Sequence, residues 1–394
     1  MSGREVMKRI CVYVGSRANY SSCKPIMRAI QGNPDLELMI MLGASALLER
    51  FGKLEDILAT DGSAPSAKFY MVVEGETPVT MAKSVGLGVI ESSTILNNLN
   101  PDLLLVVGDR FDVMAPVLAA AYMNIPIAHT MGGEITGTID ESTRHAITKF
   151  SHIHFPATEE ARNRIVKLGE NPDHVFNVGC PRLDLVKEAI TNANDSTITL
   201  SDALNTIGVG ATFDLDQSSF ILVSQHPVTT EYGSNRVQIE STLEVLNRFQ
   251  MPTVMIWPNV DAGSDEVSKG IRTFREYFQP NWLHLFTNLP VEQYFMLMDR
   301  CACLIGNSSS AIREGAFLGT PAVNIGTRQT GRTRGRNVVD VQPIVDEIES
   351  AIGKQLKHGR YESDDLYGDG SASQRIVKII ADLSYISVQK RITY

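Results

Sequence analysis

Residues 129–149 bring acids and bases together in a glycine-rich loop and the predicted helix behind it. The glycines Gly132, Gly133 and Gly137 allow sharp backbone turns and the close approach of a ligand. The acids of this segment are Glu134, Asp140 and Glu141, and its bases are Arg144, His145 and Lys149. Such acids can move protons, while the bases can hold an anion. A capped helix with surface charges would account for each residue alone, but not for the paired glycines before it.

The spacing of two residues within 129–149 predicts that they lie on one face of a helix. Asp140 and Arg144 are four residues apart, so they share a face on a helix that begins near Thr138. Thr138 or Asp140 is the expected N-cap of that helix. The apolar run 125–128 predicts a buried strand just before the loop.

Other predicted strand ends carry candidate side chains, as expected for open α/β sheets. Arg17 follows the first strand at the mouth of a glycine turn, with a surface arginine as the alternative. Asp109 follows the fourth strand and would lie on a cleft floor, unless it or Asp112 only caps a helix. His226 follows the first strand of the second half, and Pro227 fixes the turn there. A histidine is easily tuned for proton transfer near neutral pH.

Two segments in the second half suit an anion. The residues that would open a helix after residue 306 are Ser308, Ser309, Ser310, Arg313 and Glu314. Hydroxyls and free backbone N–H groups at the positive end of a helix dipole attract negative charge. The loop after the next strand carries four arginines, Arg328, Arg332, Arg334 and Arg336. In a chain of net charge −9 they predict a local anion site, with a plain basic loop as the alternative.

Composition limits the classes of function. A length of 394 residues with 43% hydrophobic and 21% charged residues indicates a globular protein of two domains. The net charge of −9 argues against nucleic-acid binding. Five cysteines without CxxC or zinc spacing indicate a reducing cytoplasm, and the sequence shows neither a signal peptide nor a membrane-spanning run. We see no dinucleotide or Walker fingerprint and no metal-ligand spacing, so no cofactor and no metal are expected.

Continuous apolar runs alternate with helical patterns along the whole chain. The expected strands are 10–14, 36–42, 69–73, 103–107, 125–128, 153–155 and 175–178, then 220–223, 253–256, 283–286, 303–305, 322–325 and 338–339. The expected helices include 22–31, 84–99, 113–123, 159–168, 234–249, 291–300, 311–318 and 371–384. Continuous rather than alternating runs indicate parallel sheets buried on both faces.

The fold class that follows is α/β, with two doubly wound Rossmann-like domains that face a cleft. The regular pattern breaks between about residues 187 and 217. We therefore expect an N-terminal domain at 1–190, which carries the acid/base residues, and a C-terminal domain at 215–370. Residues 371–394 would form a helix that packs back on the N-terminal domain.

Seven motifs in this order resemble those of the UDP-N-acetylglucosamine 2-epimerases. They are G-S-R-A-N-Y (15–20), G-D-R-F-D (108–112), G-G-E-I-T-G-T-I-D-E-S-T-R-H-A-I-T-K (132–149), Q-H-P-V-T-T (225–230), P-N-V-D-A-G-S (258–264), G-N-S-S-S (306–310) and G-T-R-Q-T-G-R (326–332). The resemblance is strongest to the hydrolysing branch, which serves the synthesis of sialic-acid-type and legionaminic-acid-type sugars. It implies a glycosyltransferase-B-like fold, a UDP-sugar substrate and a homodimer or homotetramer.

The resemblance also implies a reaction and roles. UDP leaves C1 by anti-elimination as the C2 proton is removed, which gives a 2-acetamidoglucal, and hydration then yields N-acetylmannosamine and UDP. Proton transfer is implied for Asp109, Glu134 and Asp140, with Arg144 orienting a carboxylate and His226 acting near the diphosphate. UDP would be held by Arg17, Ser308, Ser309, Ser310, Arg313 and Arg328, and Glu314 matches a ligand of the nucleotide ribose.

One departure from the family pattern concerns the acid/base group. Many relatives have a glutamate two residues after the histidine of the fifth strand, where this chain has Met131. Since methionine cannot transfer a proton, we expect Glu134 or Asp140 to do this work.

Four alternatives compete with this reading. One is the same chemistry on UDP-2,4-diacetamido-2,4,6-trideoxyglucose, and another is a non-hydrolysing 2-epimerase, against which the loop pattern at 132–149 argues. A glycosyltransferase would share the fold, but we see no signal for an acceptor site. A silent nucleotide-sugar-binding module is disfavoured by the retained acids and by His226.

Overall fold

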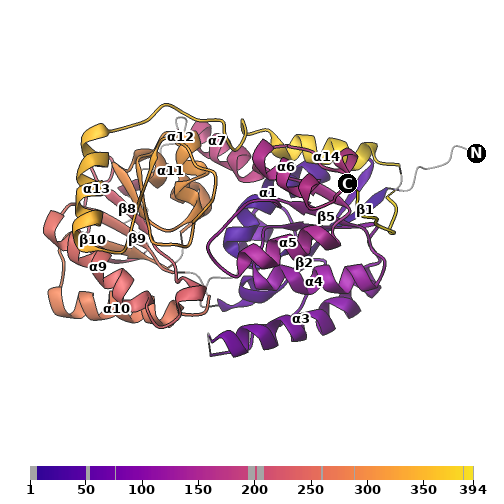
Figure 1. The fold of residues 1–394 in the computed structure, drawn as a ribbon, viewed down its shortest axis with the longest axis horizontal. Coiled ribbons are helices and arrows are strands. Elements are labelled where there is room, and N and C mark those ends of the chain that lie inside the picture. Colours follow the sequence, from indigo (N-terminus) through magenta and orange to yellow (C-terminus); the bar gives the residue numbers. More distant parts are fainter. Residues whose placement is uncertain are drawn as a thin grey trace, which may run out of the picture. The chain divides into compact units, whose positions relative to one another are not determined.

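A computed structural model describes residues 7–49, 54–75, 77–193, 200–201, 208–258, 261–287, 289–384 and 386–393. The chain divides into two compact units, each of which forms its own internal contacts. Unit 1 comprises Met1–Glu134, Asp140–Leu185 and Gly368–Tyr394, and unit 2 comprises Ile135–Ile139 and Val186–Tyr367. Each unit is built on one sheet with helices packed against it (Figure 1).

The sheet of unit 1 is parallel and has the strand order β3-β2-β1-β4-β5-β6. Its strands are β1 (Lys8–Val14), β2 (Leu36–Leu42), β3 (Ala67–Lys68), β4 (Leu103–Val107), β5 (Ile127–Thr130) and β6 (Ile153–Phe155). This is the doubly wound Rossmann order. Every residue of β4 and β5 is buried, which is why the apolar runs are continuous rather than alternating.

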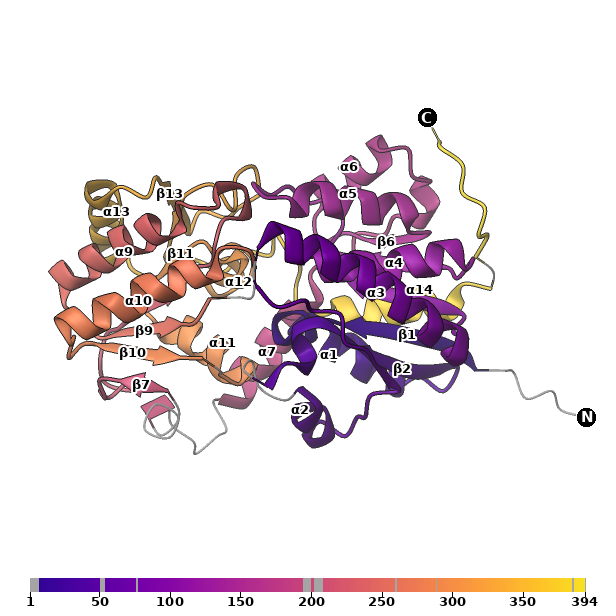
Figure 2. The ribbon, with the colours of Figure 1, turned by 90° about the horizontal axis from the view of Figure 1, so that it is seen from below.

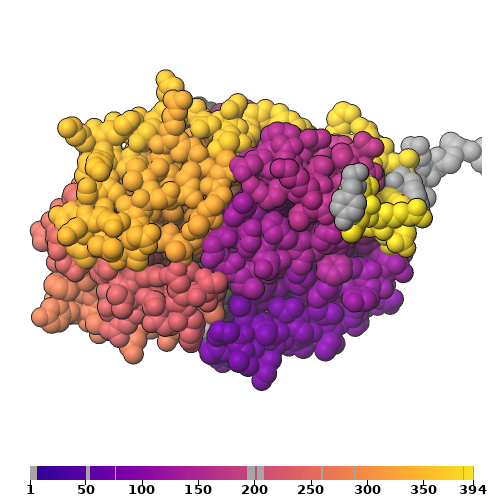
Figure 3. Space-filling model, viewed as in Figure 1, coloured from indigo at the N-terminus to yellow at the C-terminus, as the bar shows by residue number. Residues whose placement is uncertain are grey.

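Helices cover this sheet in separate groups. They are α1 (Arg17–Gln31), α2 (Leu54–Thr60), α3 (Pro78–Leu99), α4 (Phe111–Tyr122), α5 (Asp140–Phe150), α6 (Glu159–Lys167) and α14 (Ala372–Asp382), with short 3-10 turns at η1 (Ala44–Leu47) and η3 (Pro172–His174). Helix α7 (Pro181–Ala193) begins in unit 1 and belongs to unit 2 from Val186 onward. Helices α3, α4 and α5 are neighbours, whereas α14 lies along α1 (Figure 2). The segment after α14 lies on the surface of unit 1 (Figure 3), where Lys390 binds the carbonyl oxygens of Lys149 and Ser151.

Two strands expected in unit 1 differ from the structure. The run 69–73 contains no strand, since the short β3 ends just before it, and Phe69 and Met71 instead fill the core beside the sheet. The run 175–178 forms only an isolated bridge between Val175 and His154. Val178 donates its N–H to the carbonyl of Pro156, but proline has no N–H to return, so the ladder cannot continue.

The sheet of unit 2 has the order β13-β12-β11-β8-β9-β10-β7. Its strands are β7 (Val209–Gly210), β8 (Ile221–Ser224), β9 (Thr253–Ile256), β10 (Leu283–Phe286), β11 (Cys303–Gly306), β12 (Ala322–Ile325) and β13 (Val338–Val341). All pairs are parallel except that of β10 with β7, an edge pair which the hydrophobic pattern did not indicate. Its core lies between these strands and the helices that flank them.

The helices of unit 2 are α9 (Asn235–Phe249), α10 (Ser264–Phe278), α11 (Val291–Arg300), α12 (Glu314–Leu318) and α13 (Val345–His358), with 3-10 turns at η4 (Thr229–Glu231) and η5 (Ser309–Ala311). The helix expected over 311–318 is wrong as one element, because η5 and α12 are separate. No helix among the described residues is both long and apolar enough to cross a bilayer.

Candidate active site

Arg144 gathers three groups at the carboxyl ends of the strands of unit 1. Its side chain is fully buried on α5, and Nη1 donates to the carbonyl oxygen of Glu134 at 2.7 Å and to Oε2 of Glu141 at 3.1 Å. Nη2 donates to Oδ2 of Asp109, which follows β4. The guanidinium therefore connects the turn after β4 with the glycine loop and with the first turn of α5.

The charge of Arg144 is stabilised by its partners. Burial lowers the pKa of Arg144, but the carboxylates of Asp109, Glu134 and Glu141 more than offset that effect and hold it above its ordinary value. The side chain of Asp109 remains 20% exposed, so this carboxylate is both oriented by an ion pair and reachable from solvent. Such a group can accept a proton from a bound molecule.

His129 supports the turn that presents Asp109. Its Nε2 lies 2.9 Å from the carbonyl oxygen of Gly108, and its Nδ1 lies 3.4 Å from Oγ1 of Thr148. Because a carbonyl only accepts, Nε2 carries the hydrogen and Nδ1 accepts from Thr148. Burial lowers the pKa of His129 to about 3, so the ring is neutral and acts as a fixed donor.

The remaining acids of this segment, Glu134 and Asp140, lie on either side of Gly137. Glu134 is buried, whereas Asp140 is partly exposed as the first residue of α5. Helix α5 begins at Asp140, close to the expected start, and contains both Asp140 and Arg144. Met131 is buried in a left-handed conformation with a φ of 65°, which is uncommon for a residue other than glycine, asparagine or aspartate.

Gly137 explains part of the glycine pattern, but through contact with backbone and not with a ligand. It lies in unit 2, where its N–H donates to the carbonyl of Arg328 at 3.1 Å and its carbonyl accepts from Oγ1 of Thr230 at 3.2 Å. A Cβ atom at this position would overlap the carbonyl oxygen of Thr327. Only glycine allows this close approach.

Arg17 begins α1, and Ser16 caps this helix by accepting from the N–H of Asn19. Among the residues that the structure describes, the buried Nε of Arg17 has no hydrogen-bond partner. Burial lowers the pKa of Arg17. Such a partly exposed guanidinium with unused donors can bind an anion.

The capping role considered for Asp109 and Asp112 is wrong, because Arg110 occupies the N-cap of α4 and no side chain caps it. Asp112 is buried and accepts from the hydroxyl of Tyr13 at 3.2 Å and from Nε of Arg110 at 3.1 Å.

His226 lies in unit 2, directly beyond β8, in a clamp that the sequence did not reveal. The side chain of Asn307 accepts from the N–H of His226 at 2.7 Å and donates to its carbonyl at 2.8 Å. The ring Nε2 is 3.3 Å from Oγ of Ser224. Asn307 thus fixes the backbone from which the imidazole projects, and the only sequence signal for it was its place in the serine turn.

The serine turn follows β11 and is ordered by a tyrosine. Oγ of Ser310 lies 2.6 Å from the hydroxyl of Tyr294 on α11 and 2.8 Å from Oγ of Ser308. The N–H of Ser310 also donates to Oγ of Ser308 at 3.3 Å. The expected helix dipole is weaker than predicted, because these serines precede a five-residue helix that begins only at Glu314. Hydroxyls and side chains must therefore supply most of any anion binding.

The predicted cluster of arginines is dispersed among different partners. Arg328 donates to the carbonyl of Asn307 at 3.2 Å, Arg332 contacts the carbonyl of Ile135 at 3.4 Å, and Arg334 is paired with Asp340. The fourth, Arg336, is exposed. Arg328 therefore lies beside the serine turn, while Arg334 is largely neutralised.

The structure separates the candidate residues into two groups. Unit 1 holds Arg17, Asp109, Glu134, Asp140 and Arg144, and unit 2 holds His226, Ser308, Ser309, Ser310, Arg313, Glu314 and Arg328. Arg313 and Glu314 are both buried next to the serine turn. Asn259 and Val260, within the motif at 258–264, lie outside the described residues. Across the described part of the chain, no group of three or more His, Cys, Asp or Glu residues is arranged to hold a metal ion.

Comparisons with known proteins give a consistent result. The family model described as UDP-N-acetylglucosamine 2-epimerase matches residues 28–381. The chain is 28% identical to a UDP-N,N'-diacetylbacillosamine 2-epimerase (hydrolyzing) of Legionella pneumophila, over 95% of this chain and 96% of that protein. It is 27% identical to a UDP-N-acetylglucosamine 2-epimerase of Neisseria meningitidis, over 98% of both. It is 30% identical to a GDP/UDP-N,N'-diacetylbacillosamine 2-epimerase (hydrolyzing) of Campylobacter jejuni, over 88% of this chain and 87% of that protein.

Solved structures share the fold. The crystal structure of UDP-GlcNAc 2-epimerase from Neisseria meningitidis bound to UDP-GlcNAc matches with a TM-score of 0.78 at 20% identity, covering 95% of this chain and 99% of that chain. The enzyme from Methanocaldococcus jannaschii in complex with UDP-GlcNAc and UDP matches with a TM-score of 0.77 at 17% identity, covering 94% and 99%. The fold is thus that of two Rossmann-like domains.

Proposed function

Because this chain belongs to the UDP-N-acetylglucosamine 2-epimerase family, we propose that it is a hydrolysing 2-epimerase, which converts UDP-N-acetylglucosamine and water to N-acetylmannosamine and UDP. In the first step a base removes the C2 proton while the C1–O bond breaks, and UDP departs with the bonding electrons. The product is 2-acetamidoglucal. In the second step water adds its hydroxyl to C1 and a proton returns to C2 on the other face of the ring.

The observation that carries this proposal is the arrangement around Arg144. The guanidinium holds Asp109 and the backbone of Glu134 in place before any substrate arrives. A base that is already oriented does not spend free energy on ordering itself during the reaction. Asp109, Glu134 and Asp140 are therefore our candidates for the proton transfers at C2.

The C2 proton is poorly acidic, so departure of UDP must lead the first step. The residues that we assign to UDP are Arg17, Ser308, Ser309, Ser310, Arg313 and Arg328, with Glu314 as ligand of the ribose hydroxyls and His226 near the diphosphate. Removal of one well-placed donor of this kind costs about 10²–10³ in rate. We propose that these side chains neutralise the diphosphate without a divalent cation.

The same chemistry on a UDP-2,4-diacetamido-2,4,6-trideoxy sugar is the second candidate. It is favoured by the names of two relatives, those of Legionella pneumophila and Campylobacter jejuni, both of which are hydrolysing diacetylbacillosamine epimerases. A non-hydrolysing epimerase would carry out the elimination but return UDP to C1 of the 2-epimer.

Proton and phosphorus NMR of the reaction in D₂O separates these possibilities. Release of UDP with a free 2-epimer that carries deuterium at C2 supports the proposal, and the better of the two substrates identifies the sugar. A sugar that stays bonded to UDP would instead indicate the non-hydrolysing reaction. Turnover should persist in EDTA, and its loss there would refute metal-free neutralisation of the diphosphate.

Variants of the acids test the proton transfers. We expect Glu134→Gln and Asp140→Asn to lower turnover. The control is Asp173→Asn, which changes an exposed acid in η3 that we do not assign to the site and should leave turnover unchanged. Near-normal turnover in both of the first two variants would show that the assignment of the acid/base group is wrong.

A further inference from the structure

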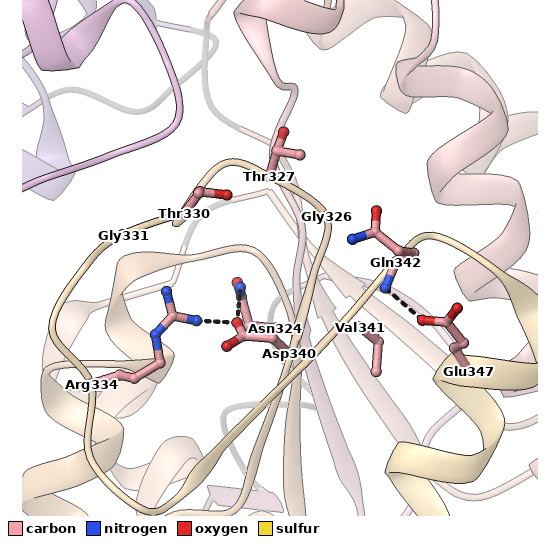
Figure 4. A pocket seen from close by; sticks show the side chains of 10 residues that line it. All are labelled: Asn324, Gly326, Thr327, Thr330, Gly331, Arg334, Asp340, Val341, Gln342 and Glu347. Carbon is pink, nitrogen blue, oxygen red and sulfur yellow. Dashed lines mark hydrogen bonds and ion pairs between the residues drawn. The ribbon is translucent and has the colours of Figure 1, made fainter.

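Unit 2 contains a hollow that the proposed reaction does not use. Its volume is about 280 Å³, and it lies at the carboxyl ends of β12 and β13 (Figure 4). Its lining residues include Asn324, Gly326, Thr330, Arg334, Asp340 and Gln342. The carboxyl ends of parallel strands are where open α/β sheets bind ligands. None of the residues that we assign to UDP lines it.

Asn324 lies at the buried end of this hollow with an unused acceptor. The residue is 2% exposed, and its Nδ2 donates to Oδ1 of Asp340 at 2.7 Å. Because a carboxylate only accepts, this bond fixes which end of the amide is nitrogen. Among the described residues, Oδ1 of Asn324 has no hydrogen-bond partner. A buried acceptor left unsatisfied is costly, so a donor from a ligand would be bound favourably.

Asp340 supplies a second acceptor beside the first. It is the cross-strand partner of Asn324, and Arg334 also donates to its Oδ1, so that both neighbours converge on this carboxylate (Figure 4). The side chain of Asp340 is 53% exposed, and both of these bonds use the same oxygen. Oδ2 therefore remains open toward solvent, on a carboxylate that is already held in position.

The wall of the hollow leaves room for a ligand. Gly326 has a φ of 77° and nothing within 4 Å of the place where a Cβ would lie. Thr330 and Gln342 are exposed on the rim and can exchange hydrogen bonds with water or a ligand. A volume near the lower end of the range for ligand pockets suits one small ring and not a whole nucleotide.

We propose that this hollow is a second binding site, which takes a compact ligand with two neighbouring hydroxyl groups, such as a free N-acetylhexosamine or a ribose. The hydroxyls donate to Oδ1 of Asn324 and to Oδ2 of Asp340. Arg334, whose Nε and Nη2 donate to the carbonyl oxygens of Arg332 and Gln329, holds Asp340 in position. A carboxylate that accepts from sugar hydroxyls at a strand end is the same device by which doubly wound folds bind ribose.

Saturation-transfer NMR on the full-length protein with saturating UDP tests this site. The probes are N-acetylmannosamine as a free sugar, methyl β-D-ribofuranoside as a ribose, and methyl 2-deoxy-β-D-ribofuranoside, a deoxy sugar whose locked furanose ring carries no two neighbouring hydroxyl groups. We expect transfer to one or both of the first two and at least a tenfold weaker response with the deoxy sugar. The probe that responds more strongly identifies the source of the diol.

Variants locate the signal. Asp340→Ala, at an exposed position, should weaken binding at least tenfold, and so should Asn324→Leu. Asp346→Ala is the matched control, because this exposed acid on the first turn of α13 does not line the hollow. Absence of transfer to every probe in the wild type, or equal transfer in Asp340→Ala, would overturn the proposal. So would a signal that disappears when UDP is added, since the sugar would then occupy the UDP-sugar site.

Discussion

Replacement of Arg144 by methionine should destabilise unit 1 substantially. The substitution leaves a side chain of similar length but removes the donors to Asp109, to Glu141 and to the carbonyl of Glu134. Breaking a buried ion pair costs about 3–5 kcal/mol. Water can reach the two carboxylates, which are 20% and 30% exposed, so we expect about 3 kcal/mol, at the lower end.

The chain offers a way to measure this loss in one unit. Both of its tryptophans, Trp257 and Trp282, lie in unit 2. Tryptophan fluorescence in a urea titration therefore follows unit 2, whereas amide hydrogen exchange in α5 follows unit 1. Arg144→Met should accelerate exchange in α5 and leave the fluorescence transition in place.

Two variants control the experiment. Arg375→Met removes an exposed ion pair with Asp369 on the same unit, together with one hydrogen bond to the carbonyl of Val178, and should cost clearly less than Arg144→Met because the pair is exposed. Asp109→Asn combined with Arg144→Met should recover part of the loss, because the uncompensated carboxylate is gone. A loss below about 1 kcal/mol in Arg144→Met, or no recovery in the double variant, would refute the view that Arg144 organises this site through its charge.

Three further results are expected. Tyr294→Phe should weaken UDP binding several-fold in calorimetry without weakening uridine binding, because the hydroxyl chain from Tyr294 through Ser310 to Ser308 loses its outermost hydroxyl group. Equal loss for both ligands would contradict this. Burial alone would raise the pKa of Glu170, but hydrogen bonds from His154, Lys149 and Lys390 outweigh it and lower this pKa to about 2. The ionised Glu170 therefore stabilises the fold above pH 4.5, and this contribution disappears as the pH falls toward 2. Its test is a comparison of urea transitions in wild type and Glu170→Gln between pH 6 and 3, where a constant difference would refute the linkage. All five cysteines are buried, and burial raises the thiol pKa of four of them, Cys11, Cys23, Cys301 and Cys303. A thiol reagent should therefore react with the native protein far more slowly than with the urea-unfolded chain.

Much of the fold was predictable from local patterns, and the exceptions arose where an apolar run is buried without pairing as a strand. Continuous apolar runs such as 103–107 predicted buried parallel strands, because a strand covered on both faces has no polar side. The run 69–73 is also apolar, yet Phe69 and Met71 reach the core without strand pairing, and Tyr70 is exposed. An apolar run predicts that a segment is buried, but it does not predict whether its backbone N–H and C=O groups form hydrogen bonds with a neighbouring strand.

For the candidate site too, the sequence predicted where side chains lie along the fold but not which of them are in contact. Strand ends placed Asp109, His226 and the serine turn near the carboxyl edges of their sheets, since parallel strands share that edge. The clamp of Asn307 on His226 joins residues 81 positions apart, and the bond from Arg144 to Asp109 spans 35. Tyr294 had no signal beyond its place on a helix, and the dispersal of the arginines depended on partners such as Asp340.

Residue types and their order along the chain thus determined the fold class, the strand ends that carry chemistry and the family. Tertiary structure alone decided which side chain meets which, because hydrogen bonds and ion pairs depend on distances of a few ångströms between segments that the sequence keeps far apart. It also decided which acceptors stay unused, as at Asn324, because that depends on every neighbour at once.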